Sequence, residues 1–352
     1  MKKQIKFFLF LIVMLPGGGC FHASASDFVK VIPGAKSAAM GNTGVTFTGI
    51  ESMYLNPAGL TGVDCEVSEF SHIRHFEEII FNYVGVAFPL KFGAAGFSFL
   101  YMDIPEFQGY DEWGFKTKKI KSSGNIFNLG LSFNLWEDKF TSKNISLGIS
   151  GKYITERLDT RDISSPASDA GLLYQTNILD NEIRIGISVK NLSQDNLFSN
   201  AALQAGISCL TRFLNKDLFM SVESSAKTQN LGIEYELTDF LSARAGLKKN
   251  PGLLTSVGFS YGIAMKISKF TFEYSNNAHS ELDISHRFSI KVFFQSAEKE
   301  QSYPEEVFEK GMDLYSEGRY AEAMLEFNRV IELDPLNKEA LEMLKDCYSK
   351  IK

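Results

Sequence analysis

From about Glu66 to Phe294, apolar residues alternate along the chain with small or polar residues. The clearest segment runs from Ile126 to Trp136, where one face carries Phe127, Leu129, Leu131, Phe133 and Leu135. Asn, Gly and Ser occupy the positions between them. Because successive side chains of a β-strand point to opposite faces, this pattern predicts a strand with one apolar face and one small, polar face.

The same alternation recurs at residues 145–150, 183–190, 231–237, 241–248, 256–263 and 270–275. We count about 14 such strands, which lies within the range of bacterial outer-membrane barrels. A large soluble β-sandwich also alternates. However, Gly, Ser and isolated charges dominate the non-apolar faces, which is not the Lys, Glu and Thr mixture of a solvated sheet.

The expected connections between strands alternate in length, which also favours a membrane barrel. Short turns are expected around residues 89–92, 180–181, 215–217, 238–239 and 266–269, with a somewhat longer one at 137–143. Longer connections are expected at residues 103–123, 156–168 and 191–200. Short periplasmic turns and longer outer loops characterise outer-membrane barrels. The pattern predicts an all-β transmembrane barrel of about 14 antiparallel strands over residues 65–295, with both termini in the periplasm.

The first 25 residues read as an export signal. Lysines at positions 2, 3 and 6 precede an apolar run over residues 7–15, and Ala23-Ser24-Ala25 fits a cleavage site. Cys20 follows three glycines, so lipidation of Cys20 is an alternative that stays open. The other three cysteines are widely spaced without a CxxC motif, which argues against a disulfide framework or a zinc site.

The amino-acid composition limits which classes of partner the protein can bind. The net charge of −6 argues against nucleic acid, whose phosphates require clustered Lys and Arg. Phenylalanine (30 residues) and tyrosine (13) are abundant, whereas there are only 2 tryptophans. In a barrel, this aromatic excess belongs to lipid-facing positions, so outer-membrane lipid is the expected surrounding.

The segment over residues 26–64 does not alternate. It contains Gly34-Ala-Lys-Ser-Ala-Ala-Met-Gly41-Asn-Thr-Gly44, followed by Tyr54-Leu-Asn56-Pro57-Ala58-Gly59-Leu. A small-residue run followed by Asn-Pro-Ala-Gly-Leu resembles the N-terminal plug, or hatch, of the FadL-type fatty-acid transporters. The sequence of this segment is more similar still to the related PorV/PorQ-type outer-membrane proteins and to FadL-like families of spirochaetes. We call residues 26–64 the hatch.

The resemblance implies that the hatch closes the lumen and contacts any ligand there. The candidate hatch residues are Gly34, Gly41, Gly44, Asn56, Pro57, Ala58 and Gly59. Small residues let the backbone pass close to the wall, and Pro57 restricts the path of the chain at one turn. The alternative is a fixed N-terminal segment packed in the barrel with no moving part.

Several charges fall on the inward-facing positions of the later strands. The candidate lumen residues are Arg184, Lys190, Glu234, Arg244 and Glu273. Glu223, Glu236, Lys248 and Lys291 share the same face. Because both signs are present, these charges either pair across the lumen and close it to water or form a polar patch for an anionic headgroup.

After Phe294 the apolar period changes from two to that of a helix. We predict a polar linker over residues 296–304 and a helical unit over 305–352, whose residues match the positions of a tetratricopeptide repeat. One repeat buries little surface, so we expect the unit to dock on the periplasmic rim of the barrel, to pair with another copy or to bind a periplasmic protein partner. The candidate contacts are Leu314, Tyr320 and Phe327. The alternative is a stabilising appendage without a partner.

No catalytic constellation is present, and neither a metal nor a cofactor is expected. His72 and His75 form an HxxH spacing, which on a strand places the two rings on opposite faces. The sequence therefore indicates a non-enzymatic outer-membrane protein of a diderm bacterium. Its expected function is transport of hydrophobic or amphipathic small molecules, such as long-chain fatty acids. The alternative is a PorV-like scaffold or component of protein secretion or surface attachment, with the repeat recruiting a partner.

Overall fold

The computed structural model describes residues 28–75, 78–138, 143–179, 181–193, 202–250, 257–277, 285–294, 298–333 and 337–351. The expected signal peptide and Cys20 lie outside the described residues. The chain divides into two compact units, residues 1–294 and 295–352. No helix within the described ranges is long and apolar enough to cross a membrane.

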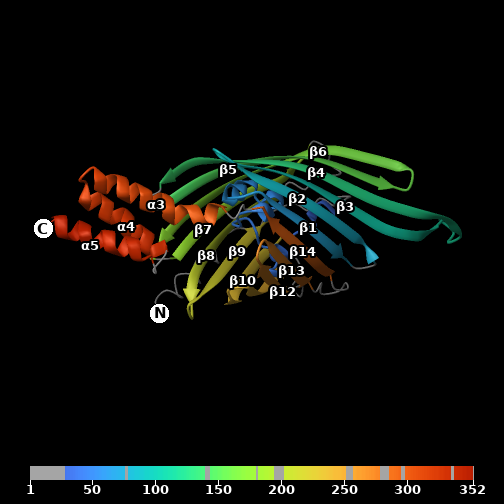
Figure 1. Ribbon diagram of the computed structural model, residues 1–352. Coiled ribbons are helices and arrows are strands. Elements are labelled where there is room, and N and C mark those ends of the chain that lie inside the picture. Colours follow the sequence, from blue (N-terminus) through green and yellow to red (C-terminus); the bar gives the residue numbers. More distant parts are fainter. Residues whose placement is uncertain are drawn as a thin grey trace. The chain divides into compact units, whose positions relative to one another are not determined.

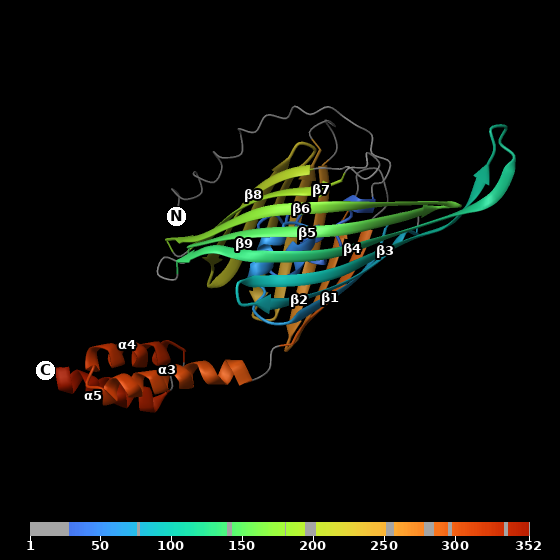
Figure 2. The same ribbon diagram turned by 90° about the horizontal axis from the view of Figure 1, so that it is seen from above.

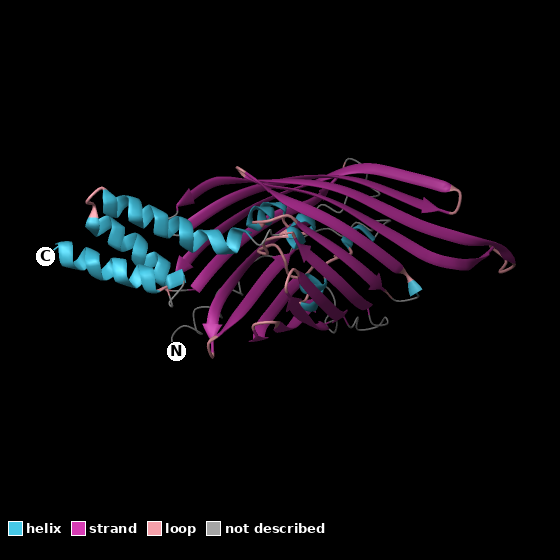
Figure 3. Ribbon diagram, viewed as in Figure 1, coloured by secondary structure: helices cyan, strands magenta, loops and turns pink. Residues whose placement is uncertain are grey.

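The first unit is a closed antiparallel β-barrel of 14 strands (Figures 1 and 3), which confirms the predicted fold class. Its strands are β1 Val67–Arg74, β2 Ile80–Leu90, β3 Gly93–Tyr110, β4 Lys116–Asp138, β5 Lys143–Leu158, β6 Arg161–Ile178, β7 Asn181–Leu192, β8 Ala202–Phe213, β9 Lys216–Ser225, β10 Gln229–Thr238, β11 Leu241–Lys249, β12 Val257–Ile267, β13 Phe270–Asn277 and β14 Ser285–Phe293. Each strand pairs with its neighbours in sequence, and β1 closes the barrel by pairing with β14. Val67 lies opposite Phe293, so the barrel begins and ends at the same edge.

The two faces of each strand differ as the alternation predicts. On β4, Phe127 and Leu129 point outward and are 45% and 58% exposed, whereas Asn128 between them is buried. The outward faces of β12 and β13 carry exposed Phe259, Tyr261 and Phe272. The barrel therefore presents a continuous aromatic and aliphatic outer surface, as a lipid-facing wall requires.

The connections correct the expected loop lengths. The turns between β2 and β3, β8 and β9, β10 and β11, and β12 and β13 are two residues long, as expected. However, most of the expected loop at residues 103–123 is strand, because β3 continues to Tyr110 and β4 starts at Lys116. The expected loop at residues 156–168 is also strand apart from a two-residue turn, where Asp159 adopts the left-handed conformation with φ 56°.

The hatch lies inside the ring of strands (Figure 2). Its short helices are η1 Phe28–Lys30, α2 Ala35–Ala39, η2 Ile50–Tyr54 and η3 Pro57–Gly62. Helix α2 packs against β11–β14, whereas η3 packs against β3–β6 on another part of the wall. Most of the described hatch residues are buried, so the hatch packs closely within the barrel.

The second unit contains three helices, α3 Glu298–Ser316, α4 Tyr320–Leu333 and α5 Lys338–Ile351. Helix α3 packs on α4, and α4 packs on α5. Helix α3 begins within the segment expected as a linker and continues through Pro304. The linker was expected because residues 296–304 are polar. Glu, Lys and Gln are nonetheless good helix formers, so the helix starts at Glu298.

Candidate functional site

Glycines in the barrel wall let the hatch backbone approach closely. Added Cβ atoms would lie 2.0 Å from Gly41 N at Gly246, 2.0 Å from Ala58 N at Gly148 and 2.4 Å from Val45 O at Gly186. A Cβ on Gly171 would lie 1.9 Å from Asn56 Oδ1. These separations are too short for any side chain. The glycines of β5, β6, β7 and β11 are therefore required where the hatch lies against the wall.

The Asn-Pro-Ala-Gly element holds the second half of the hatch. Asn56 Nδ2 donates to Val45 O (2.7 Å) and to Leu172 O of β6 (3.2 Å), while Asn56 Oδ1 accepts from Ala58 N (3.1 Å). Pro57 starts η3, where its missing N–H is not needed. Gly59 packs against Phe47 O, which a Cβ would approach to 2.0 Å. Asn56 therefore connects the two halves of the hatch and fixes both to the wall.

The first half of the hatch, up to Val45, is held by contacts at its glycines and by Glu223 of β9. The buried carboxylate of Glu223 accepts from the backbone N–H groups of Gly44 and Val45, the latter at 2.5 Å. Gly41 adopts a left-handed conformation with φ 70° where its N–H donates to Ser260 Oγ (2.9 Å). Gly34 lies near the carboxylate of Glu69 on β1. The sequence predicts an inward position for Glu223 but does not indicate that the hatch backbone donates hydrogen bonds to it.

Three of the five candidate lumen charges form one network with two hatch charges. Arg244 pairs with Glu234 (2.5 Å) and Glu273 (2.8 Å). Lys36 of the hatch binds Glu234 at 3.3 Å. Lys291 bridges Glu273 (2.9 Å) to Glu51 of the hatch. The charges therefore pair both within the wall and between the wall and the hatch.

The other two candidate lumen charges lie outside this network. Arg184 pairs with Glu182 (2.6 Å) and donates to Thr48 Oγ1 of the hatch (3.2 Å). Lys190 is buried on β7. The sequence missed a further buried ion pair, Lys152–Asp169 (2.6 Å), whose ammonium lies 4.7 Å from the ring centroid of Tyr54.

The two hatch charges could have been found from the sequence. Lys36 and Glu51 are the only charged residues over positions 31–63. A charge in an otherwise uncharged, buried segment needs a partner of opposite sign. Which wall residue supplies that partner depends on contacts between residues about 200 positions apart, and only the fold provides these.

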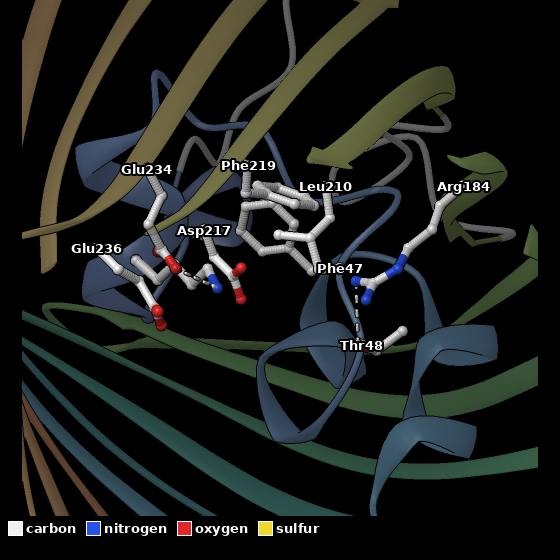
Figure 4. Close-up of a pocket in the computed structure, with 9 residues that line it drawn as sticks. Phe47, Thr48, Arg184, Leu210, Asp217, Phe219, Glu234 and Glu236 are labelled. Atoms are coloured by element: carbon white, nitrogen blue, oxygen red, sulfur yellow. Dashed lines mark hydrogen bonds and ion pairs between the residues drawn. The ribbon is translucent and has the colours of Figure 1, made fainter. Parts of the chain in front are cut away.

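A half-open pocket of about 210 Å³ lies beside the hatch at the short-turn end of β7–β10 (Figure 4). Its lining combines both signs of charge with an aromatic pair and comprises Lys36, Phe47, Thr48, Arg184, Leu210, Asp217, Phe219, Glu234 and Glu236. Phe47 and Phe219 meet edge to face at 5.6 Å, with Lys36 and Arg184 within 6 Å of the Phe219 ring. The pocket is therefore amphipathic, and Lys36 connects it to the charge network.

Another part of the lumen holds a buried apolar cluster, beside which the Lys152–Asp169 pair lies. Inward-facing side chains of β1–β6 form a buried cluster that includes Ile73, Phe81, Tyr83, Leu100, Met102, Ile126, Ile154 and Ala167. Phe28 and Val29, at the start of the described hatch, pack into this cluster. We call this cluster the apolar chamber. It lies toward the longer connections, whereas the pocket lies toward the short turns.

The helical unit corrects one candidate partner contact. Phe327 is completely buried, packs on Phe308 and touches the position where Gly311 lacks a side chain. It therefore belongs to the core of this unit and cannot offer a binding surface. Leu314 and Tyr320 pack at the edge of that core and remain partly exposed.

Near that edge, a polar cluster links α3 to α5. Tyr315 donates to Asp346 and also contacts Lys350. The hydrogen bond from Tyr315 lowers the pKa of the Asp346 carboxyl. This cluster holds α5 against the first helix of the unit.

No family model and no curated protein matches this sequence. Several solved structures are similar. The toluene transporter TbuX of Ralstonia pickettii aligns with a TM-score of 0.54 at 12% identity, covering 74% of this chain and 98% of TbuX. The CymD monoaromatic hydrocarbon channel aligns with a TM-score of 0.51 at 12% identity, covering 75% of this chain and 98% of CymD. At this identity the similarity shows a shared barrel fold.

Proposed function

We propose that this protein is an outer-membrane barrel that passes hydrophobic or amphipathic small molecules through a lumen closed by its hatch. The observation that carries the proposal is the apolar chamber, an inward-facing apolar surface that the N-terminal end of the hatch covers. Two of the similar structures, a toluene transporter and a monoaromatic hydrocarbon channel, support this assignment.

The contacts suggest how passage would occur. A hydrophobic cargo would replace Phe28 and Val29 against the apolar chamber, because burial of its surface offsets theirs. It would then reach the short-turn end only if the first half of the hatch leaves β9–β14. That half is held by polar contacts from Glu223 and Lys36, which water can replace. The proposal includes the signal peptide and a periplasmic position for both termini.

Uptake by intact cells tests the proposal. A diderm host without its own hydrophobic-compound uptake would express the chain and receive labelled long-chain fatty acid or toluene. Ala167→Phe adds a ring to the apolar chamber and should reduce uptake at equal surface expression. Leu172→Phe, on the outward face of the same strand, is the matched control and should leave uptake unchanged. Equal uptake by cells with and without the protein would contradict transport.

A second candidate is a scaffold, or a PorV-like component of protein secretion or surface attachment. In it the helical unit, interpreted as a tetratricopeptide repeat, recruits a periplasmic protein. The ionic attachment of the hatch to the wall, through Lys36 and Glu51, favours this interpretation. Purification from outer membranes, followed by lipid analysis and mass spectrometry of bound proteins, separates the two. Bound fatty acid without a protein supports transport, and a stoichiometric partner without lipid supports the scaffold.

A further inference from the structure

The hairpin of β3 and β4 extends beyond the rest of the barrel (Figures 1 and 2). Asp103 is the last β3 residue opposite β2, and Ser122 is the last β4 residue opposite β5. Beyond these points, over residues 105–110 and 116–121, β3 and β4 have no strand partner other than each other. Asp159 of the β5–β6 turn contacts the base of this segment, because its N–H donates to Lys121 O (2.8 Å) and its carboxylate pairs with Lys118 (2.6 Å). We call this segment the ribbon. A two-stranded ribbon is at best marginally stable in water, so contact with a further surface would stabilise its distal part.

The tip of the ribbon presents three aromatic side chains to solvent. Tyr110, Trp113 and Phe115 are 60%, 78% and 71% exposed. The turn that holds them is ordered, because Asp111 Oδ1 accepts from the N–H groups of Trp113 (3.0 Å) and Phe115 (2.8 Å). Gly114 completes the turn with φ 82°. Large aromatic side chains gathered at one exposed point mark an interaction site.

Lysines accompany the aromatic tip. Lys116, Lys119 and Lys121 are exposed on β4, and within the described part of the chain only Lys119 has a carboxylate in reach, Glu106 at 4.0 Å. Lys119 and Lys121 continue the outward face of β4 that carries Phe127 and Leu129 lower down, because Ser122 next to Lys121 is buried. The basic side chains therefore follow directly on the lipid-facing surface.

We propose that the ribbon tip binds the anionic headgroup layer of a membrane surface. Trp and Tyr place an apolar ring and a polar edge at the level of headgroups, and lysine ammonium groups contact phosphate. Two features of the molecule favour lipid as the occupant: the lysines complement anionic headgroups, and the ribbon continues the wall that faces lipid. The inference rests on the membrane location given under the proposed function.

Fluorescence of the two tryptophans tests the inference in the full chain. With Trp136→Phe, Trp113 is the single reporter, and the protein is reconstituted into vesicles of phosphatidylcholine alone or mixed with phosphatidylglycerol. In the mixed vesicles we expect a blue-shifted Trp113 emission that brominated lipid quenches. Each of the substitutions Lys116→Gln, Lys119→Gln and Lys121→Gln should lower the ratio of membrane-bound to free ribbon tip by roughly fivefold.

The reverse variant separates failure of this inference from failure of the proposed location. With Trp113→Phe, the remaining Trp136 lies exposed at the opposite end of β4 and should be quenched in both kinds of vesicle. If Trp136 is quenched while Trp113 keeps the emission of a water-exposed indole, the tip does not bind lipid and the inference is overturned. Trp113 could also be quenched equally in phosphatidylcholine vesicles and in mixed vesicles, and equally in the parent chain and in the three lysine variants. That result overturns the role of the anionic headgroup. If Trp136 is not quenched, the barrel is not in the membrane, and the proposed location fails.

Discussion

Replacement of Glu223 should release the first half of the hatch while the barrel wall stays intact. The carboxylate is buried and accepts from two consecutive hatch N–H groups, those of Gly44 and Val45. Hydrogen bonds to a charged group contribute about 1 kcal/mol more than neutral ones. Glu223→Gln keeps an acceptor but loses the charge, so the two bonds together should weaken by about 2 kcal/mol.

Glu223→Ala leaves both N–H groups buried without an acceptor, at about 1–3 kcal/mol each. Hydrogen exchange of the hatch amides, followed by mass spectrometry of the full chain in detergent, measures the effect directly. A change of about 2 kcal/mol corresponds to roughly 30-fold faster exchange at Gly44 and Val45 in Glu223→Gln. Exchange in Glu223→Ala should be faster still, and wall strands should be unchanged.

Glu236→Gln is the matched control. Glu236 lies on the neighbouring strand β10 and pairs with Lys266 of the wall at 3.3 Å. Its replacement should leave hatch exchange unaltered. If the hatch amides of Glu223→Ala exchange at the rate of the parent chain, the carboxylate does not hold the hatch, and the reasoning is refuted.

Three further predictions concern the wall and the helical unit. Gly246→Val places a side chain where the hatch backbone lies, so proteolysis of the hatch should become faster; an unchanged rate would contradict the close approach. Lys152→Ala leaves the buried Asp169 without its partner, which should cost about 3–5 kcal/mol and lower the thermal midpoint of the barrel. Phe327→Ala empties the core of the helical unit at about 3–5 kcal/mol, visible as earlier loss of its helical circular dichroism. Leu325→Ala, at an exposed position of the same helix, should have little effect.

Alternation predicted the barrel because each wall residue contacts either lipid or lumen. The segment from Phe127 to Phe133 is the clearest case, and its outward and inward faces in the structure follow the sequence. The pattern was lost in the ribbon for a physical reason. Register shifts between Ile104 and Phe107 and between Gln108 and Tyr110 interrupt the period of two, so strand was taken for loop.

The charge network shows what sequence can and cannot supply. Glu234 and Arg244 lie directly opposite each other across the β10–β11 hairpin, so their pairing follows from the position of the turn. Lys36 reaches Glu234 only because the hatch folds back through the barrel. Contacts over such a separation depend on how the hatch is packed, and no local pattern encodes that.

If passage requires the hatch to leave the wall, a reversible cross-link between hatch and wall should stop it. Thr46 of the hatch and Ser221 of β9 place their hydroxyl oxygens 3.4 Å apart, so Thr46→Cys with Ser221→Cys should form a disulfide once the native cysteines are replaced by serine. Ser71 and Ser289, 2.7 Å apart on two wall strands, give the matched control pair. We expect uptake of the hydrophobic cargo to stop in the oxidised hatch variant, to return on reduction and to persist in the control. Full uptake through the oxidised hatch variant would contradict the account.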